Sequence, residues 1–206
     1  MEENRALIII DMQNDFCPGG ALAVPGGDEI IPVINKLSCK FKRIIATQDW
    51  HPPNHVSFAV NHPGKKEFDV INCEGIEQVL WPKHCVTGTK GAEFNSELDA
   101  MKFDLILRKG NNPKIDSYSA FKENDKKTLT GLEGYLKNLN VKKTYFCGLA
   151  LDYCVFYSAM DSKELGFETY VIIDGTKGID SPEGNIDKSL NVMRKKRIEI
   201  IESNDL

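Results

Sequence analysis

Long hydrophobic runs are missing from this chain, and their absence argues against a membrane-spanning or secreted protein. The apolar stretch near the N-terminus covers only residues 6–10 and is followed by an aspartate. A membrane-spanning helix needs ~20 apolar residues, and a secretory signal peptide needs a longer apolar region than this one. We therefore expect no membrane partner and no secretory leader.

An excess of basic residues is also missing. The chain of 206 residues has 26 Lys and Arg against 30 Asp and Glu, which gives a formal net charge of −4. Proteins that bind nucleic acid usually present a basic face. The one basic cluster, residues 193–197, falls at the end of a helical pattern, where cations offset the helix dipole. We therefore expect no nucleic-acid partner.

Paired cysteines are the third absence. The six cysteines form no Cys-x-x-Cys motif, which is the usual mark of a structural zinc site or a redox pair. A chain of this length buries enough apolar surface to fold without a disulfide framework. We therefore expect reduced thiols, most of them packed as small core side chains, and a cytoplasmic location.

Short apolar runs alternate with amphipathic segments along the chain. The predicted strands are residues 6–10, 43–47, 104–108, 144–147, 168–173 and 198–201. The predicted helices are residues 28–41, 128–139, 152–165 and 183–195, with Thr128 and Asp152 as candidate N-caps. This alternation predicts an α/β fold with a doubly wound, six-stranded, mainly parallel sheet and helices on both faces. Residues 1–206 are expected to form a single domain.

Residues from about 50 to 93 interrupt this alternation. They are rich in Pro, Asn, His and Gly, and they contain no convincing long helix or strand. Long irregular segments inside a compact domain are usually functional. We therefore expect this excursion, residues 50–93, to carry residues that bind a ligand.

Chemically useful side chains follow the ends of the predicted strands. Asp11 follows the first strand, Asp49 and His51 follow the second, Lys109 follows the third, and Cys154 lies just beyond the fourth. Ligands of open α/β sheets bind outside the carboxyl ends of the strands. The sequence therefore predicts that these five side chains converge at one edge of the sheet.

Cys154 has the setting of a nucleophile, because it falls in the first turn of a predicted helix. A helix N-terminus lowers the pKa of a thiol, and its free N–H groups are suited to hold an oxyanion. Asp11, at the end of a buried strand, is suited to act as the base. The alternatives are a structural cysteine, an aspartate that caps a turn, and a surface lysine at position 109.

A metal site is the second prediction for this edge. Side chains two apart on an extended segment point the same way, so Asp49 and His51 are paired. With His84 they form a site with open positions, which suits Zn²⁺ first and also Fe²⁺ or Mn²⁺. His55 is either a fourth ligand or a residue behind the ligands. For His84 alone, a hydrogen-bonded loop histidine is the alternative.

Five segments carry a resemblance to a known family. They are residues 11–20, residues 47–52, residues 81–86, residues 109–110 with 118–121, and residues 147–155. Together they resemble the nicotinamidases of the isochorismatase-like cysteine hydrolase superfamily, in the family's order and over nearly the whole chain. The resemblance implies a hydrolase of linear amides that converts nicotinamide to nicotinate and ammonia in NAD salvage. It also implies activity on pyrazinamide.

The resemblance assigns roles to the residues of the reaction. Cys154 attacks the carboxamide carbon to form a thioester, Asp11 accepts the thiol proton, and Lys109 balances the charge between them. The N–H groups of Ala150 and Cys154 form the oxyanion hole, and the peptide bond between Leu149 and Ala150 is cis.

The resemblance also describes how the substrate is held. The metal takes the pyridine nitrogen of nicotinamide, and the aromatic side chains of Phe16, Trp81 and Tyr118 line the ring pocket. For these three residues, an ordinary place in the core is the alternative. The expected partner is a small-molecule substrate, and the chain is either a monomer or a homo-oligomer.

One departure and two competing functions remain. Leu151 stands where the family often has Thr, which changes local hydrogen bonding without removing a catalytic atom. The first competitor is a cysteine hydrolase of a carbamoyl or ureido compound, but such relatives generally lack the ligands Asp49, His51 and His84. The second is a non-catalytic metal- or ligand-binding protein on the same scaffold.

Overall fold

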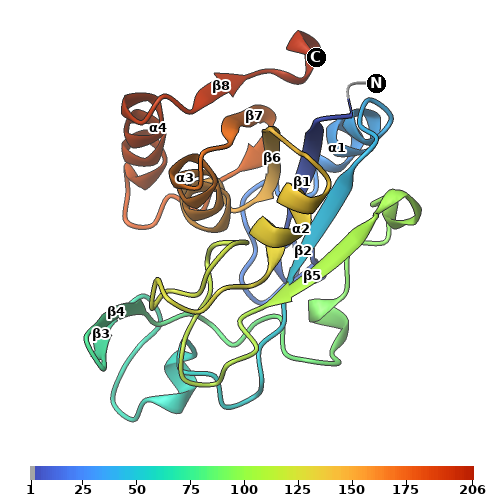
Figure 1. The fold of residues 1–206 in the computed structure, drawn as a ribbon. Coiled ribbons are helices and arrows are strands. Elements are labelled where there is room, and N and C mark those ends of the chain that lie inside the picture. Colours follow the sequence, from blue (N-terminus) through green and yellow to red (C-terminus); the bar gives the residue numbers. More distant parts are fainter. Residues whose placement is uncertain (1–2) are drawn as a thin grey trace.

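Six parallel strands form the central sheet of the structure, a computed structural model that describes residues 3–206 (Figure 1). The strands are β1 (Arg5–Ile10), β2 (Ile44–Asp49), β5 (Leu105–Lys109), β6 (Lys143–Leu149), β7 (Glu168–Lys177) and β8 (Glu199–Ile201). Their order across the sheet is β5-β2-β1-β6-β7-β8, and every neighbouring pair is parallel. The predicted α/β class and doubly wound six-stranded sheet are confirmed.

Helices cover both faces of the sheet (Figure 1). They are α1 (Ile31–Ser38), α2 (Leu132–Asn138), α3 (Phe156–Glu164) and α4 (Asn185–Lys195). The side chains of β1 alternate between two cores, as successive residues of a strand must. Leu7 and Ile9 pack with α1 on one face, whereas Ile8 and Ile10 pack with the other three helices on the opposite face. Burial on both faces explains why the central strands are continuous apolar runs.

Two predicted helix caps are wrong. Thr128 does not begin α2, which starts after Gly131, and its hydroxyl instead donates to Asp125 at 2.7 Å. Asp152 does not begin a helix either, because it lies inside a π-helical turn, Leu151–Val155, that precedes α3. Polar side chains that seem suited to a cap also bond to other nearby groups, and both residues do so here.

A β-hairpin lies within the excursion, where no regular element was predicted. Its strands are β3 (Val70–Cys73) and β4 (Ile76–Val79), which pair antiparallel. The turn residues Glu74 and Gly75 have positive φ angles of 51° and 90°, and such two-residue turns match the twist of a hairpin. The strands are short and largely exposed, so they leave a weak apolar pattern in the sequence.

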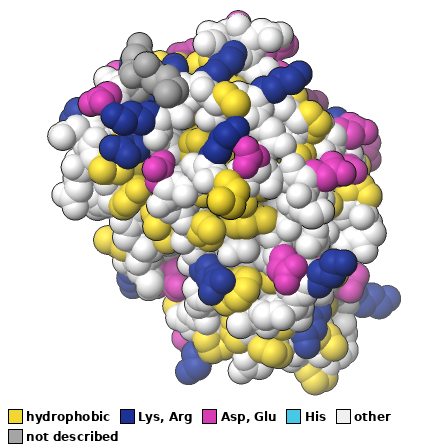
Figure 2. Space-filling view, turned by 90° about the vertical axis from the view of Figure 1, so that its right-hand side faces the viewer, with side chains coloured by type: hydrophobic (Ala, Val, Ile, Leu, Met, Phe, Trp, Pro, Cys, Tyr) yellow, Lys and Arg dark blue, Asp and Glu magenta, His cyan; other side chains and the backbone are white. Residues whose placement is uncertain are grey.

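The surface mixes charged and apolar side chains. On the face drawn in Figure 2, Lys and Arg alternate with Asp and Glu, and yellow hydrophobic side chains lie between them. Within residues 3–206, no helix combines the length and the apolar character needed to cross a membrane. The large exposed hydrophobic side chains include Val60, Phe68, Val70, Met101, Ile106 and Leu129. Half of these six belong to the excursion.

Candidate active site

The strand order reverses between β1 and β6. From β1 the chain continues to β2 and β5 on one side, whereas β6 is followed by β7 and β8 on the other. Open α/β sheets bind ligands at the carboxyl ends of the strands beside such a reversal. Asp11 directly follows β1, and Cys154 follows β6. Their carboxylate and thiol atoms lie within 4.8 Å of each other, so the topology brings the predicted base to the predicted nucleophile.

Asp11 is held in an unusual backbone conformation. Its φ is 47°, a region that few residues other than glycine adopt. The Thr47 hydroxyl donates to Asp11 Oδ1 at 2.6 Å and accepts the Asp11 N–H at 3.2 Å. Burial raises the pKa of the Asp11 carboxyl, and the cation of Lys109 offsets this only in part. A raised pKa makes the carboxylate a stronger proton acceptor.

Lys109 lies close to the proposed base Asp11, the proposed nucleophile Cys154 and the candidate metal ligand Asp49. Its Nζ lies 2.9 Å from Asp11 Oδ2 and 2.5 Å from Asp49 Oδ1. It also donates to the carbonyl of Ser117 at 2.8 Å and lies 3.4 Å from Cys154 Sγ. Although burial disfavours its charge, the two carboxylates raise the pKa of Lys109 well above its usual value. Lys109 is therefore a permanent cation that balances two buried carboxylates, rather than a surface lysine.

Cys154 lies in the π-helical turn, with its side chain almost fully buried. Burial raises the pKa of its thiol well above the ordinary value, and Lys109 opposes this only in part. The sequence predicts a lowered pKa from the helix N-terminus, and that direction is wrong. The physical reason is burial beside the carboxylates of Asp11 and Asp49. A neutral thiol needs a base, which gives Asp11 a defined task.

The loop before the nucleophile has the expected shape. The peptide bond between Leu149 and Ala150 is cis, as the resemblance implied. Gly148 precedes it with φ 105°, and a Cβ at this position would lie 2.1 Å from the carbonyl oxygen of Ile10. Only glycine therefore fits between β6 and β1 at this point. The oxyanion hole formed by the N–H groups of Ala150 and Cys154 stays a prediction.

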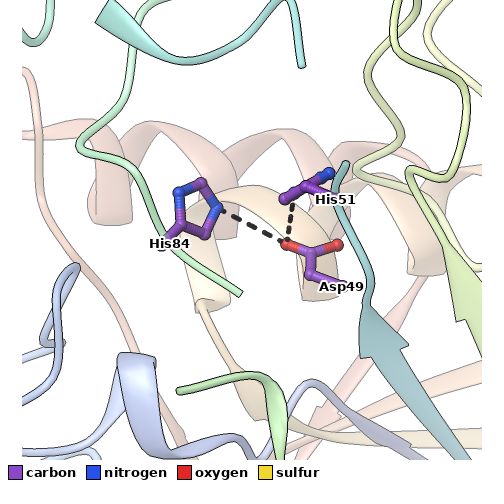
Figure 3. Close-up of side chains that lie close together, drawn as sticks. All are labelled: Asp49, His51 and His84. Atoms are coloured by element: carbon purple, nitrogen blue, oxygen red, sulfur yellow. Dashed lines mark ion pairs between the residues drawn. The ribbon is translucent and has the colours of Figure 1, made fainter. Parts of the chain in front are cut away.

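The candidate metal ligands are Asp49, His51 and His84, whose side chains lie close together (Figure 3). His51 Nε2 lies 3.5 Å and His84 Nε2 lies 3.8 Å from Asp49 Oδ2. His51 Nδ1 lies 2.9 Å from the carbonyl of Gly110, and His84 Nδ1 lies 2.7 Å from that of Pro82. A carbonyl only accepts, so each Nδ1 carries a proton and each Nε2 directs a lone pair at the centre. This donor set fits a divalent cation.

The electrostatics of the cluster also favour positive charge. Although burial opposes ionisation, Lys109 and then His51 hold the pKa of Asp49 well below its usual range. Burial likewise opposes a charge on His51, yet Asp49 raises the pKa of His51. Ligand atoms of Asp49, His51 and His84 all lie within 4.8 Å of one another, and all three residues are buried. A small cation is therefore stabilised where these atoms meet.

His55 lies behind His51 rather than in the cluster around Asp49. The centroids of the two imidazole rings are 4.2 Å apart, and His55 Nδ1 lies 2.7 Å from Ser57 Oγ. Burial and then the neighbouring His51 lower the pKa of His55 to about 4. His55 forms a second group of potential ligands with His51 and Asp116. Its role as a fourth ligand stays a prediction.

A narrow pocket opens beside Cys154 and the ligand cluster. The three aromatic residues predicted for it, Phe16, Trp81 and Tyr118, all line it. The Trp81 indole N–H donates to the Tyr118 hydroxyl at 3.1 Å, which fixes the two rings relative to each other. The Phe16 ring lies 5.4 Å from the imidazole of His84, measured between centroids. The pocket therefore offers aromatic walls between a thiol and a metal site.

Several residues of the site were missed in the sequence. Thr47 and Gln13 orient it: Gln13 donates to the carbonyl of Asp49 at 2.8 Å and accepts its N–H at 2.8 Å. Both lie inside the segments that carry the family resemblance, which could have marked them. Asp116 and Ile179 also line the pocket. Neither residue directly follows a predicted strand, so no local pattern in the sequence indicates them.

Comparison with known proteins agrees with this geometry. Residues 5–205 match the family model described as Isochorismatase domain, so the chain belongs to the isochorismatase-domain family. Within that family it is similar to proteins named nicotinamidase. The nicotinamidase of Acinetobacter baylyi is 54% identical over 177 residues, which are 86% of this chain and 83% of that protein.

Solved structures lead to the same group. The Acinetobacter baumanii nicotinamidase and pyrazinamidase has a TM-score of 0.98 and 48% sequence identity, and the match covers 100% of this chain and 99% of that one. The pyrazinamidase of Pyrococcus horikoshii, solved in complex with zinc, has a TM-score of 0.78 and 38% identity, and the match covers 97% and 99%. The chain thus resembles these enzymes over its full length.

Proposed function

We propose that this chain is an amidohydrolase that converts nicotinamide to nicotinate and ammonia, in the salvage of NAD. The observation that carries the proposal is the meeting of Asp11, Lys109 and Cys154 beside a cluster of metal ligands and an aromatic pocket. Nicotinamidase relatives with 54% and 41% identity over most of the chain support it. Pyrazinamide has a ring of the same shape and is a second substrate, as in the named relatives.

The reaction divides into two steps. In the first, Cys154 Sγ attacks the carboxamide carbon while Asp11 accepts the thiol proton. Asp11 then gives this proton to the amide nitrogen, the carbon–nitrogen bond breaks, and ammonia leaves a thioester on Cys154. In the second, Asp11 accepts a proton from water, which attacks the thioester carbon. The carbon–sulfur bond breaks, the proton held by Asp11 passes to the sulfur of Cys154, and the product leaves as nicotinate after its carboxyl group loses a proton to water or ammonia.

Two further groups stabilise charge during these steps. Lys109 stays protonated and lies near both Asp11 and Cys154, so it stabilises the thiolate as the proton moves. We assign the N–H groups of Ala150 and Cys154 to the negative charge that develops on the amide oxygen. The cation and the N–H donors thus act on the two atoms at which negative charge appears.

Asp49, His51 and His84 are the residues that would hold a divalent metal. We expect zinc first, with Fe²⁺ or Mn²⁺ as alternatives, because a carboxylate and two imidazoles suit all three. When bound, the metal supplies a Lewis acid for the pyridine nitrogen of the substrate. The relative solved in complex with zinc supports this assignment.

The lining of the pocket supports a flat aromatic amide as the substrate. Phe16, Trp81 and Tyr118 surround the space between the thiol and the ligand cluster, and aromatic side chains favour contact with an aromatic ring. A linear carbamoyl or ureido compound without a ring has no group to pack against these walls and no ring nitrogen for a metal. The cytoplasmic location stays a prediction, and both a monomer and a homo-oligomer stay alternatives for the oligomeric state.

Replacing the nucleophile tests the proposed function. The Cys154→Ala variant should release no ammonia from nicotinamide while its metal content stays near that of the parent. Mass spectrometry of parent protein quenched in acid during turnover should find a nicotinoyl group on the peptide that contains Cys154. Cys147→Ala is the matched control, because Cys147 is a buried cysteine of the preceding strand and should keep activity. Substantial ammonia release by Cys154→Ala would exclude the thioester route.

A further inference from the structure

Asp152 is a buried acidic residue that the proposed reaction does not use. It lies two residues before Cys154, and only 2% of its surface is exposed. A buried carboxylate is unfavourable unless hydrogen bonds stabilise it. The groups that donate these bonds therefore indicate what the side chain does.

The groups that donate hydrogen bonds to the Asp152 carboxylate belong to one segment, residues 178–185, which connects β7 to α4 and includes the first residue of α4. Asp152 Oδ1 accepts the N–H of Ile179 at 2.9 Å. Asp152 Oδ2 accepts the N–H of Asp180 at 3.0 Å and the side-chain amide of Asn185 at 3.1 Å. Hydrogen bonds to a charged acceptor are stronger than neutral ones, so this one side chain anchors the segment firmly.

The next residue anchors the same segment a second time. The Tyr153 hydroxyl donates to the carbonyl of Ser181 at 2.5 Å. The Tyr153 ring packs edge-on against Trp81 with centroids 4.8 Å apart, so the bond joins the segment to an aromatic wall of the pocket. Gly178 permits the close approach, because a Cβ there would lie 2.9 Å from Asp152 Oδ1.

Ile179 belongs to this anchored segment and lines the substrate pocket, together with Tyr153. Its backbone N–H is one of the groups bound by Asp152, so the position of its side chain depends on that carboxylate. Because the pocket is narrow, a small displacement of this wall changes which ring fits beside Cys154. The nucleophile and the wall are thus fixed to each other by adjacent residues of a single turn.

We propose that Asp152 and Tyr153 form a clamp on residues 178–185 that holds Ile179 as a wall of the pocket and so sets the size of ring admitted. This inference rests on the proposed function of the same pocket. Asp152 is a positioning residue, because it acts through Ile179 and does not contact the reacting atoms.

Two variants test the clamp with little change of shape. Asp152→Asn keeps one acceptor oxygen but turns an NH₂ group toward N–H donors, so at least one of its bonds is lost. Tyr153→Phe keeps the ring and removes only the bond to Ser181. The measured quantity is kcat/KM for nicotinamide divided by kcat/KM for a nicotinamide with a methyl group on the ring.

Both variants should lower this ratio, because a displaced Ile179 leaves room for the methyl group. The expected fall is about tenfold for Asp152→Asn, at the lower end of what one methylene contributes to discrimination. The fall should be smaller for Tyr153→Phe. The KM for nicotinamide should rise more than kcat falls, because the clamp positions the ring and performs no proton transfer.

Hydrogen exchange gives a readout that does not depend on turnover. In Asp152→Asn the amide of Ile179, that of Asp180 or both should exchange faster than in the parent, because the variant keeps a single acceptor oxygen. Asp174→Asn is the matched control: Asp174 also binds a backbone N–H, that of Ser203 at 2.8 Å, but it does not line the pocket. It should leave both the ratio and these two amides unchanged.

The outcomes separate the clamp from the proposed function. A folded Asp152→Asn or Tyr153→Phe variant that keeps the parent's ratio would overturn the inference, and so would unchanged exchange at both Ile179 and Asp180 in Asp152→Asn. If Asp152→Asn does not fold, Tyr153→Phe decides the matter. A parent protein that releases no ammonia from nicotinamide contradicts the proposed function instead, and the exchange comparison then still decides whether the clamp holds the wall.

Discussion

Replacing Gly110 by alanine should weaken metal binding without altering a ligand. The φ of Gly110 is 67°, a conformation that costs other residues roughly 1–2 kcal/mol. The added Cβ would lie 2.4 Å from His51 Cε1 and 2.6 Å from His51 Nδ1, which is closer than atoms approach. The ring must therefore move away, and this movement breaks the 2.9 Å hydrogen bond between His51 Nδ1 and the Gly110 carbonyl.

Loss of such a supporting bond behind a metal ligand typically lowers metal affinity about 10- to 100-fold. Competition with a chromophoric chelator measures this change, and the matched control is Gly131→Ala. Gly131 has φ 93°, and nothing lies within 4 Å of an added Cβ, so this variant should lose stability but keep metal affinity. Zinc binding by Gly110→Ala as tight as that of the parent would show that the hydrogen bond to the Gly110 carbonyl does not support His51 as a ligand.

Three further substitutions test the support of the base, the set of metal ligands and the packing of α2. Thr47→Val removes the hydroxyl that donates to Asp11; a bond to a charged group contributes about 1.5–3 kcal/mol, so kcat/KM should fall roughly 10- to 100-fold at normal metal content, and an unchanged kcat/KM would contradict this. His84→Ala should lose the metal and raise the KM for nicotinamide; metal content equal to the parent's would remove His84 from the ligand set. Leu136→Ala, at a fully buried position of α2, should lower the free energy of unfolding by about 2–5 kcal/mol in urea denaturation, and a loss below about 1 kcal/mol would show that α2 packs loosely.

The strands were predictable because burial on both faces leaves a strong pattern. The sequence predicted a strand at residues 6–10, and the structure has β1 at Arg5–Ile10. Helix ends were less predictable, because the side chain of a candidate cap residue also forms hydrogen bonds with groups other than the N–H groups of the helix end. Asp152 illustrates this, because its carboxylate accepts hydrogen bonds from a segment that is distant in sequence. No local sequence pattern predicts those donors. The extent of the domain, residues 1–206, stays a prediction.

The candidate site was predictable where side chains directly follow strands. Asp11 and Lys109 illustrate this, because parallel strands end at a common edge and bring their next residues together. The supporting contacts were not predictable in this way, since Thr47 reaches Asp11 only through the pairing of β1 with β2. The direction of the Cys154 pKa was wrong for a related reason, because burial is a property of the folded chain and opposes the effect of a helix N-terminus.

Ammonia release from nicotinamide by the purified protein decides whether this chain is a metal-dependent nicotinamidase. It should be measured before chelator treatment, after it, and after a divalent metal is added back. We expect release that the chelator abolishes and the metal restores, with none from Cys154→Ala at any stage. Protein with an occupied metal site and no ammonia release from nicotinamide would contradict the substrate assignment.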